Sequence, residues 1–193
     1  MLTRDIAHHF QEGIWPFVCC DFFSDDEIAE ILTLCRSLDL TDGTVGRGAD
    51  YEQDSGMRRS EVGFIFDDQA KWMFERLDLM IEMLNGTYFG YDLYGYDRVQ
   101  YARYGSGGHY NWHSDVGSKL PVTRKLSATI LLSDDFDGGQ FQLNMSSEDD
   151  AIDVELAKGQ MVLFPSHTLH RVKPVTRGVR ESLVVWVFGP KLR

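Results

Sequence analysis

The second half of the chain consists of short apolar segments separated by turns rich in glycine and proline, and this pattern restricts the possible folds most. We predict eight strands, at 96–104, 109–114, 126–133, 139–144, 151–156, 160–164, 168–173 and 181–188. Eight short strands separated by such turns are typical of an antiparallel β-sandwich or jelly roll.

The first part of the chain contains two helical patterns instead. Residues 14–23 are apolar and aromatic and indicate a buried strand. Ser24 and Glu27 then have the spacing of a capping box, which marks the start of a helix. A second helix is predicted over 67–84, with Gly86 as its stop. Helices followed by an antiparallel core predict an α+β protein, with a double-stranded β-helix (jelly-roll) core and N-terminal helices packed on one sheet.

The length of 193 residues predicts a single domain over 1–193. Within it we expect helical support and a flap loop in 1–93 and the jelly-roll core in 94–190. Residues 41–60 are dominated by glycine and polar side chains, with little periodicity. A long irregular loop in a compact domain is usually functional or disordered, so we interpret this segment as a mobile flap.

Charge and composition narrow the possible partners and compartments. The formal net charge of −11 repels phosphate backbones, which disfavours nucleic acid as a partner. No apolar run reaches about 18 residues, so we expect no membrane span, and the N-terminus lacks a secretory pattern. The three cysteines, Cys19, Cys20 and Cys35, form no disulfide framework, which favours a cytoplasmic protein. The oligomeric state is left open.

The sequence His113-Ser114-Asp115 is the first candidate for chemistry. Residues two apart on a strand point to the same face, so a strand here would aim an imidazole and a carboxylate at one point. That pair is two thirds of the 2-His-1-carboxylate triad that holds non-haem Fe(II). His170, inside a predicted strand, and His167, in the turn before it, are both candidates for the third ligand. His109 is a rival, because it shares the strand parity of His113.

Arg180 is the second candidate, ten residues after His170 and directly before an apolar strand. Burying a guanidinium there is costly without an anionic partner. Guanidinium groups match carboxylates with two parallel hydrogen bonds, which suits a carboxylate-bearing cosubstrate. Ser182 shares the parity of Arg180 and could add a hydroxyl, and Tyr104 could donate a further hydrogen bond. The alternative is an ordinary ion pair between Arg180 and an acidic side chain at the barrel rim.

Three stretches together resemble a known family more specifically than any of them alone. They are RYGSGGHYNWHSD at 103–115, KLSATILLSDDFDGGQFQL at 125–143 and GQMVLFPSHTLHRVKPVTRGVRESLVVW at 159–186. They resemble the Fe(II)- and 2-oxoglutarate-dependent dioxygenases, in the prolyl 4-hydroxylase-like branch, and are similar to the PKHD-type hydroxylases. The resemblance covers most of 96–188, whereas the first third of the chain agrees only in layout.

The resemblance implies a site that can be named residue by residue. Fe(II) would bind to His113, Asp115 and His170. Arg180 would hold 2-oxoglutarate, with help from Tyr104 and Ser182. Ascorbate is a candidate reductant. Some relatives place a second tyrosine on the third core strand, where this chain has leucine at 131 and 132.

The activity that the resemblance implies is hydroxylation of a peptidyl residue, proline favoured, or of a small amino-acid-like substrate, with release of succinate and CO2. We name Tyr110, Trp112, Arg58 and Arg59 as candidate substrate contacts. Two alternatives stay open: a cupin-like metal enzyme that does not use 2-oxoglutarate, and a non-catalytic jelly-roll binding module. A nucleobase demethylase is disfavoured by the acidic charge, although arginines at 47, 58 and 59 could form a local basic patch.

Overall fold

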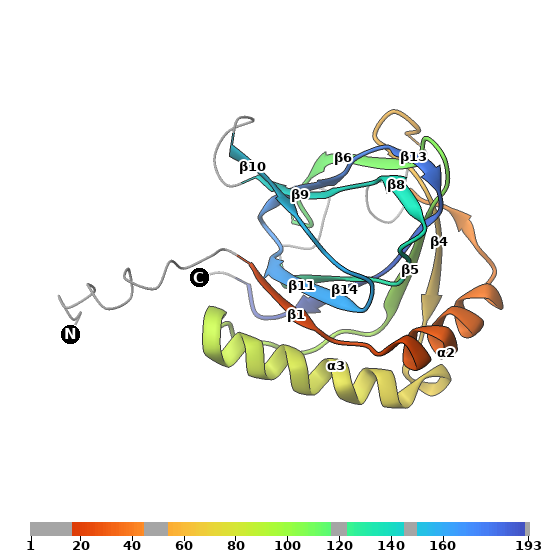
Figure 1. Ribbon diagram of the computed structural model, residues 1–193. Coiled ribbons are helices and arrows are strands. Elements are labelled where there is room, and N and C mark those ends of the chain that lie inside the picture. The colour runs from red at the N-terminus through yellow and green to blue at the C-terminus, as the bar shows by residue number, and fades with distance from the viewer. Residues whose placement is uncertain (1–16, 45–53, 117–122, 145–149, 192–193) are drawn as a thin grey trace, which may run out of the picture.

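The computed structural model describes residues 17–44, 54–116, 123–144 and 150–191. The core is built from two antiparallel sheets that face each other, with two helices beneath the larger one (Figure 1). The larger sheet has seven strands, in the order β1 (Val18–Asp21), β11 (Gln160–Pro165), β7 (Arg124–Leu131), β14 (Arg180–Phe188), β5 (Val99–Tyr104), β4 (Glu61–Ile65) and β2 (Thr41–Asp42).

The smaller sheet has five strands, in the order β10 (Ala151–Val154), β9 (Phe141–Asn144), β12 (Leu169–Val172), β6 (His109–His113) and β3 (Arg58–Arg59). A separate two-stranded sheet pairs β8 (Phe136–Gly138) with β13 (Val175–Gly178). Strands from the first 65 residues thus extend the seven-stranded sheet (β1, β2 and β4) and the five-stranded sheet (β3). The predicted jelly-roll core with helices on one sheet is confirmed.

The alternation of side chains along β14 explains the two cores. Leu183, Val185 and Val187 are buried against the helices in the larger core cluster. The residues of β14 that alternate with this row face the space between the sheets, and they include Arg180 and Ser182. One strand therefore serves both the packing of the helices and the wall of the interior pocket.

The two helices follow the apolar periodicity of the sequence. Helix α2 (Asp25–Arg36) begins at the predicted capping box, in which the backbone N–H of Ser24 donates to Glu27 (2.9 Å) and the Ser24 hydroxyl accepts from the Glu27 N–H (3.4 Å). Helix α3 (Lys71–Leu84) follows a short 3-10 helix (Asp67–Gln69). Arg76 of α3 pairs with Glu27 of α2 at 2.6 Å, which ties the helices together.

The predicted stop at Gly86 is wrong, because the chain continues as a π-helix (Asn85–Phe89). It ends at Gly90, whose φ of 67° lies in the left-handed region that glycine adopts without penalty. The β8–β13 pair was also not predicted, because both strands are short and mostly exposed. Of the predicted flap, residues 45–53 lie outside the described residues, and its described ends form β2 and β3.

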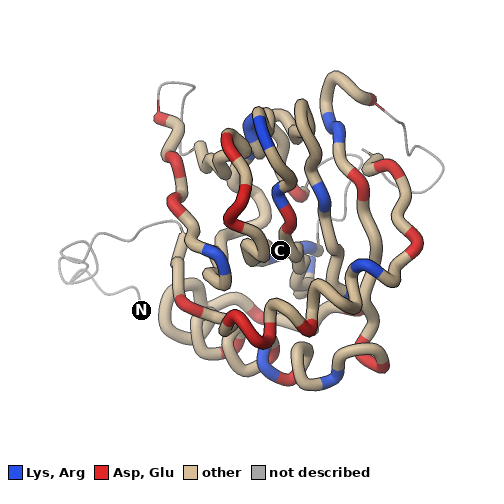
Figure 2. Tube along the Cα trace, turned by 45° about the vertical axis from the view of Figure 1, so that its right-hand side comes forward, with Lys and Arg blue, Asp and Glu red and all other residues tan. Residues whose placement is uncertain are grey.

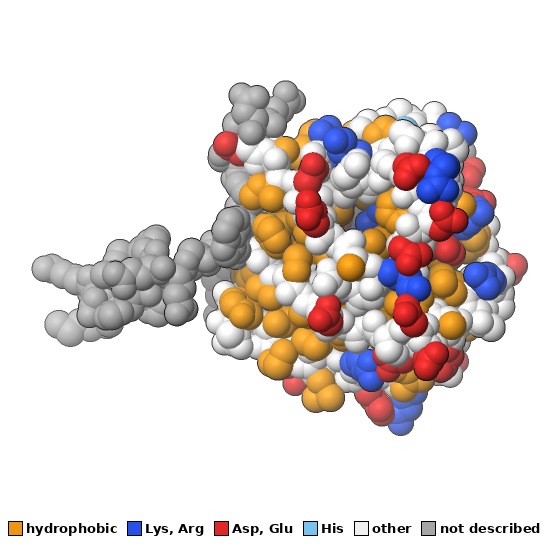
Figure 3. Space-filling view, viewed as in Figure 1, with side chains coloured by type: hydrophobic (Ala, Val, Ile, Leu, Met, Phe, Trp, Pro, Cys, Tyr) orange, Lys and Arg blue, Asp and Glu red, His pale blue; other side chains and the backbone are white. Residues whose placement is uncertain are grey.

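The charged residues are spread over the surface. Acidic residues outnumber basic ones by 30 to 19, and Figure 2 shows them on the helices and on the strands alike. On the face of Figure 3, acidic and basic side chains lie side by side, in keeping with ion pairs such as Lys158–Asp25 (2.7 Å) and Arg177–Asp137 (2.6 Å). Within the described ranges, neither helix is long and apolar enough to cross a membrane.

Candidate metal centre and cosubstrate pocket

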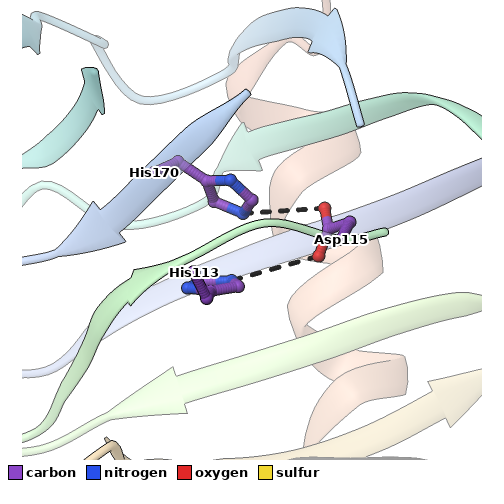
Figure 4. A group of neighbouring side chains, drawn as sticks. All are labelled: His113, Asp115 and His170. Atoms are coloured by element: carbon purple, nitrogen blue, oxygen red, sulfur yellow. Dashed lines mark ion pairs between the residues drawn. The ribbon is translucent and has the colours of Figure 1, made fainter. Parts of the chain in front are cut away.

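Three metal-ligating side chains meet between the two sheets. His113 ends β6, His170 lies opposite it on β12, and Asp115 lies two residues beyond the end of β6. Asp115 Oδ2 is 3.6 Å from His170 Nε2, and Asp115 Oδ1 is 3.9 Å from His113 Nε2 (Figure 4). Their ligand atoms all lie within 4.8 Å of one another. The three side chains therefore surround one point.

The strand predicted at 109–114 ends one residue earlier, at His113, so strand alternation alone does not place the Asp115 side chain. The backbone at Asp115 has left β6, and its N–H donates to the carbonyl of Ser166 at 2.9 Å, in the turn after β11. His167 and His109 are not in the metal-ligating group. The ring of His109 instead lies 3.0 Å from the Gly107 carbonyl and 3.2 Å from the Gly56 carbonyl.

Each histidine of the group uses its other ring nitrogen on the backbone. His113 Nδ1 lies 2.8 Å from the carbonyl of Asn111, and His170 Nδ1 lies 2.9 Å from the carbonyl of Thr168. A carbonyl can only accept, so each Nδ1 carries a proton and donates it, and Nε2 is the ring nitrogen that faces Asp115. Backbone contacts of this kind orient metal-binding imidazoles.

The electrostatics of the group also suit a cation. Burial, together with repulsion from His170, lowers the pKa of His113 to about 3, so its imidazole is neutral at physiological pH. Burial alone would raise the pKa of Asp115, but His170, His113, the Ser127 hydroxyl and Arg124 together hold that pKa below its usual value. Two imidazoles and an ionised carboxylate are the ligand set that non-haem Fe(II) takes.

Two buried serines support the carboxylate, and the sequence analysis missed both. The Ser127 hydroxyl of β7 donates to Asp115 Oδ2 at 2.6 Å, and it lies 2.9 Å from the hydroxyl of Ser166. Both serines are 1% exposed. Ser166 also accepts from the Asp115 backbone, so Asp115 is fixed at both its main chain and its side chain.

A β-bulge on β6 places a tyrosine beside the metal centre. His113 pairs with His170, but Tyr110 pairs with Val172, so β6 contains one extra residue between these pairs. Tyr110 and His113 therefore share a face although they are three residues apart. Their rings stack with centroids 3.4 Å apart, and Arg58 lies over the other ring face of Tyr110 at 4.7 Å.

Trp112, adjacent to the inward-facing His113, points away from the pocket. Trp112 packs under Arg171 of β12, at 4.4 Å from guanidinium carbon to ring centroid. Arg171 in turn donates to Gln142 of β9 at 2.6 Å. The structure thus places Trp112 on the outer face of the smaller sheet, whereas Tyr110 and Arg58 line the pocket.

Arg180 lies at the other end of the same pocket. It is 2% exposed, and its Nη1 donates to the Ser182 hydroxyl at 3.0 Å. Tyr104, which pairs with Arg180 across β5 and β14, has its ring centroid 5.7 Å from the guanidinium carbon. Among the described residues no acidic side chain pairs with Arg180, so the expected alternative of a rim ion pair is not found there.

Burying a guanidinium without a counter-charge costs free energy, because the charge loses its hydration. Burial lowers the pKa of Arg180, although the neighbouring Tyr104 opposes that effect. The cost falls if an anion enters the pocket and accepts from the guanidinium. The pocket therefore has a cation at one end and a metal-ligand set at the other.

The remaining walls of the pocket come from residues that the sequence analysis did not select. Gln100, Thr129, Phe164 and Trp186 line it. The indole N–H of Trp186 is buried without a hydrogen-bond partner among the described residues. Thr129, rather than the leucines at 131 and 132, is the β7 residue of the lining. These residues have no distinctive spacing, and only the pairing of the strands brings them together.

The family model for the 2OG-Fe(II) oxygenase superfamily matches residues 99–188, which include His113, Asp115, His170 and Arg180. Residues 99–188 thus match the model of this superfamily, and the triad within them is complete. The family and the triad together imply Fe(II) and 2-oxoglutarate as cofactors, and the donor set described above fits Fe(II).

Known proteins resemble the chain at two levels. A PKHD-type hydroxylase from Acidovorax ebreus is 40% identical over 96 residues, which are 46% of this chain and 41% of the relative. The match thus spans about two fifths of that relative's length. A Pseudomonas putida prolyl-4-hydroxylase structure has a TM-score of 0.71 at 21% identity, covering 91% of this chain and 93% of its own.

A second structure is a Trichoplax adhaerens prolyl hydroxylase in complex with a peptide fragment of the hypoxia inducible factor oxygen degradation domain. Its TM-score is 0.76 at 21% identity, covering 95% of this chain and 87% of its own. At such identity both structures support the double-stranded β-helix fold and nothing further.

Proposed function

We propose that the protein is an Fe(II)- and 2-oxoglutarate-dependent hydroxylase of a peptidyl residue, with proline as the favoured target. The observation that carries the proposal is one pocket that combines a complete 2-His-1-carboxylate group with a buried guanidinium that has no acidic partner among the described residues. The far carboxylate of 2-oxoglutarate is an anion that such a guanidinium would bind.

The residues divide the work by position. His113, Asp115 and His170 would hold Fe(II), and Ser127 and Ser166 would keep the carboxylate oriented. Arg180 and Ser182 would bind the far carboxylate of 2-oxoglutarate, beside the buried Tyr104. When bound, Fe(II) and 2-oxoglutarate supply the oxidising chemistry. It places one atom of O2 in a substrate C–H bond and the other in succinate, with loss of CO2. The apolar pocket walls exclude water from that chemistry.

A peptidyl substrate is supported by the wall nearest the triad. The Tyr110 and Trp186 rings line the pocket, and flat apolar surfaces suit a pyrrolidine ring. Burial raises the pKa of Tyr110 to about 12, so its phenol is neutral and adds no charge. Arg58 reaches from the pocket to a surface cleft along which a peptide could leave it. The peptide in the Trichoplax complex is consistent with this choice.

The experiment is an anaerobic titration of the Fe(II)-loaded protein with 2-oxoglutarate, followed by visible absorption. We expect a weak charge-transfer band from ketoacid bound to iron, and succinate release when air and ascorbate are added with proline peptides. Asp115→Ala should abolish both. Iron binding without the band would move the assignment to the cupin-like enzyme, and a protein that binds no iron would be a non-catalytic binding module.

A further inference from the structure

A second hollow lies beside the metal pocket and shares a wall with it. It is a cleft of about 490 Å³ between the β2–β4 edge of the larger sheet and the β3–β6 edge of the smaller one. Arg58 lines both the pocket and the cleft. The cleft is therefore in reach of any substrate that extends from the metal centre past Arg58.

Three arginines and three acidic side chains line the cleft, and their partners differ. Arg103 is paired with Glu61. Asp54 accepts from the backbone N–H groups of Gly56 and Met57, at 3.0 and 3.1 Å, and so caps its own turn. Arg58 has only neutral partners in the described residues: the Ser60 hydroxyl at 2.8 Å, the Thr44 carbonyl at 3.4 Å and the Tyr110 ring.

Arg59 is the cation of this cleft that has no carboxylate partner among the described residues. Asp42 is the other acidic side chain in the lining. The acidic and basic side chains of the lining are equal in number, in a chain with a net charge of −11 whose acidic residues lie on helices and strands alike (Figure 2). The case for an anion therefore rests on the exposed Arg59 guanidinium, which has no carboxylate partner among the described residues, and not on the net charge of the cleft.

The position of Arg59 is set by the glycine turn before β6. A Cβ atom at Gly107 would stand 3.0 Å from Arg59 Nη1, so the missing side chain leaves the space in which the guanidinium lies. Gly107 also has a φ of 75°. A Cβ atom at Gly108 would stand 3.1 Å from the Arg59 carbonyl, so the backbone is held as closely as the side chain. The close approach of the turn thus restricts the position of both the backbone and the side chain of Arg59.

We infer that Arg59 binds a carboxylate of the substrate, so that the substrate class is a peptide with an acidic group near the hydroxylated residue. The inference rests on the proposed function. Arg59 pairs with His109, four residues before His113 on β6. At about 3.3 Å per residue, this separates the carboxylate from the metal centre by about four residues of extended peptide. The carboxylate could belong to an Asp or Glu side chain or to the peptide's own C-terminus.

The test uses blocked peptides that each contain one proline and one glutamate, placed two to six residues to either side, in an otherwise neutral sequence. Each has a glutamine twin, and a further pair compares a free with an amidated C-terminus. Binding to the Fe(II)- and 2-oxoglutarate-loaded protein is measured anaerobically by fluorescence anisotropy. We expect glutamate at one position, or the free C-terminus, to strengthen binding about fivefold over its neutral twin.

Arg59→Gln should remove this preference, and Arg59→Lys, which keeps the charge, should retain most of it. Arg98→Gln is the matched control, because Arg98 is an exposed arginine outside the cleft that pairs with Asp97. A preference that survives in Arg59→Gln, or wild-type binding that is equal for every acid and amide twin, would overturn the inference. Failure of the proposed function would be seen separately, as wild-type protein that gives no charge-transfer band and no succinate.

Discussion

Arg180 is the single residue whose energetics depend most on what the pocket contains. Its guanidinium is 2% exposed and is satisfied by one neutral hydroxyl and a tyrosine ring. A buried charge without a counter-charge opposes folding, whereas the same charge bound to a carboxylate contributes to binding. Arg180 therefore lowers the stability of the ligand-free protein and strengthens the binding of a carboxylate ligand.

Arg180→Met tests this trade directly. Methionine keeps much of the volume without the charge, so we expect the ligand-free protein to become more stable by about 1 kcal/mol or more in urea unfolding. The stabilisation of the metal-loaded protein by 2-oxoglutarate should disappear in the same variant. A loss of ligand-free stability would instead show that Arg180 meets an anionic partner in the absence of cosubstrate.

Ser127 offers a test that does not depend on turnover. Removing the hydroxyl leaves Asp115 Oδ2 without its 2.6 Å donor in a buried site. Partners of this kind commonly contribute 10- to 100-fold to metal affinity, so Ser127→Ala should weaken Co(II) or Fe(II) binding by about that factor in a calorimetric titration. Ser133→Ala is the control, because Ser133 accepts from the Glu181 backbone and not from the triad. Equal affinities in the two variants would contradict the role of Ser127.

The residues that could be found in the sequence are those with unusual chemistry for their surroundings. A histidine and an aspartate two residues apart, and an arginine before an apolar strand, are visible without a structure. Ser127 and Ser166 are not, because serines are common and these two act through a contact between a strand and a distant turn. Trp112 was selected although it is adjacent to the inward-facing His113, and Trp186 was not although it shares the strand parity of Arg180 and Ser182. Only the inward position of Tyr110, three residues from His113, depends on the bulge.

At the scale of elements, the glycine turn before β6 determines where β3 and its arginines lie. Gly108 has no room for a side chain, because a Cβ atom would stand 2.7 Å from the Gly105 carbonyl. The Arg59 carbonyl at 3.1 Å belongs to the neighbouring strand. The turn and β3 are therefore packed backbone to backbone.

Gly108→Ala should accordingly destabilise the protein by about 1–3 kcal/mol, as measured by urea unfolding, because backbone atoms must move. Gly86→Ala is the matched control. A Cβ atom at Gly86 meets nothing within 4 Å, and alanine is the better helix former, so this change should be neutral or stabilising by up to about 1 kcal/mol. A similar effect of both substitutions would mean that the turn relaxes freely.

The elements that the sequence predicted well are those with long periodic patterns or specific end signals. The capping box at Ser24 marks the true start of α2, and the apolar row of α3 is buried as expected. The short β8 and β13 have too few residues to show a period, and the π-helix after α3 gives no signal that differs from an ordinary helix. The strand predicted at 109–114 was one residue too long, and the pattern cannot show the contact of the Asp115 backbone with Ser166 beyond its end.

At the scale of the molecule, the metal and cosubstrate sites combine residues from both sheets. His113 and His170 come from the smaller sheet, Arg180 from the larger one, and Asp115 from the segment after β6. Any ligand that binds all of them connects the two sheets across the interior. Ligand binding and global stability are therefore linked.

Metal removal should lower the melting temperature measured by differential scanning fluorimetry. At a free metal concentration of about 100 times Kd, the linkage is worth about 2.7 kcal/mol. 2-Oxoglutarate should add its own increment only when metal is present, because the ketoacid needs both ends of the pocket. Asp115→Ala should abolish the metal-dependent shift. A 2-oxoglutarate shift of full size in chelator-treated protein would contradict this order.

The extra residue in β6 has a consequence for anyone who redesigns this scaffold. An idealised strand would alternate strictly, and a designer who kept the sequence but built β6 without the bulge would place Tyr110 and His113, three residues apart, on opposite faces. Tyr110 would then turn outward while His113 kept its pairing, and the histidine would lose the ring that stacks on it. The bulge must therefore be kept when this sequence is redesigned. Templates for similar pockets should specify the bulge together with the three-residue spacing between the tyrosine and the histidine.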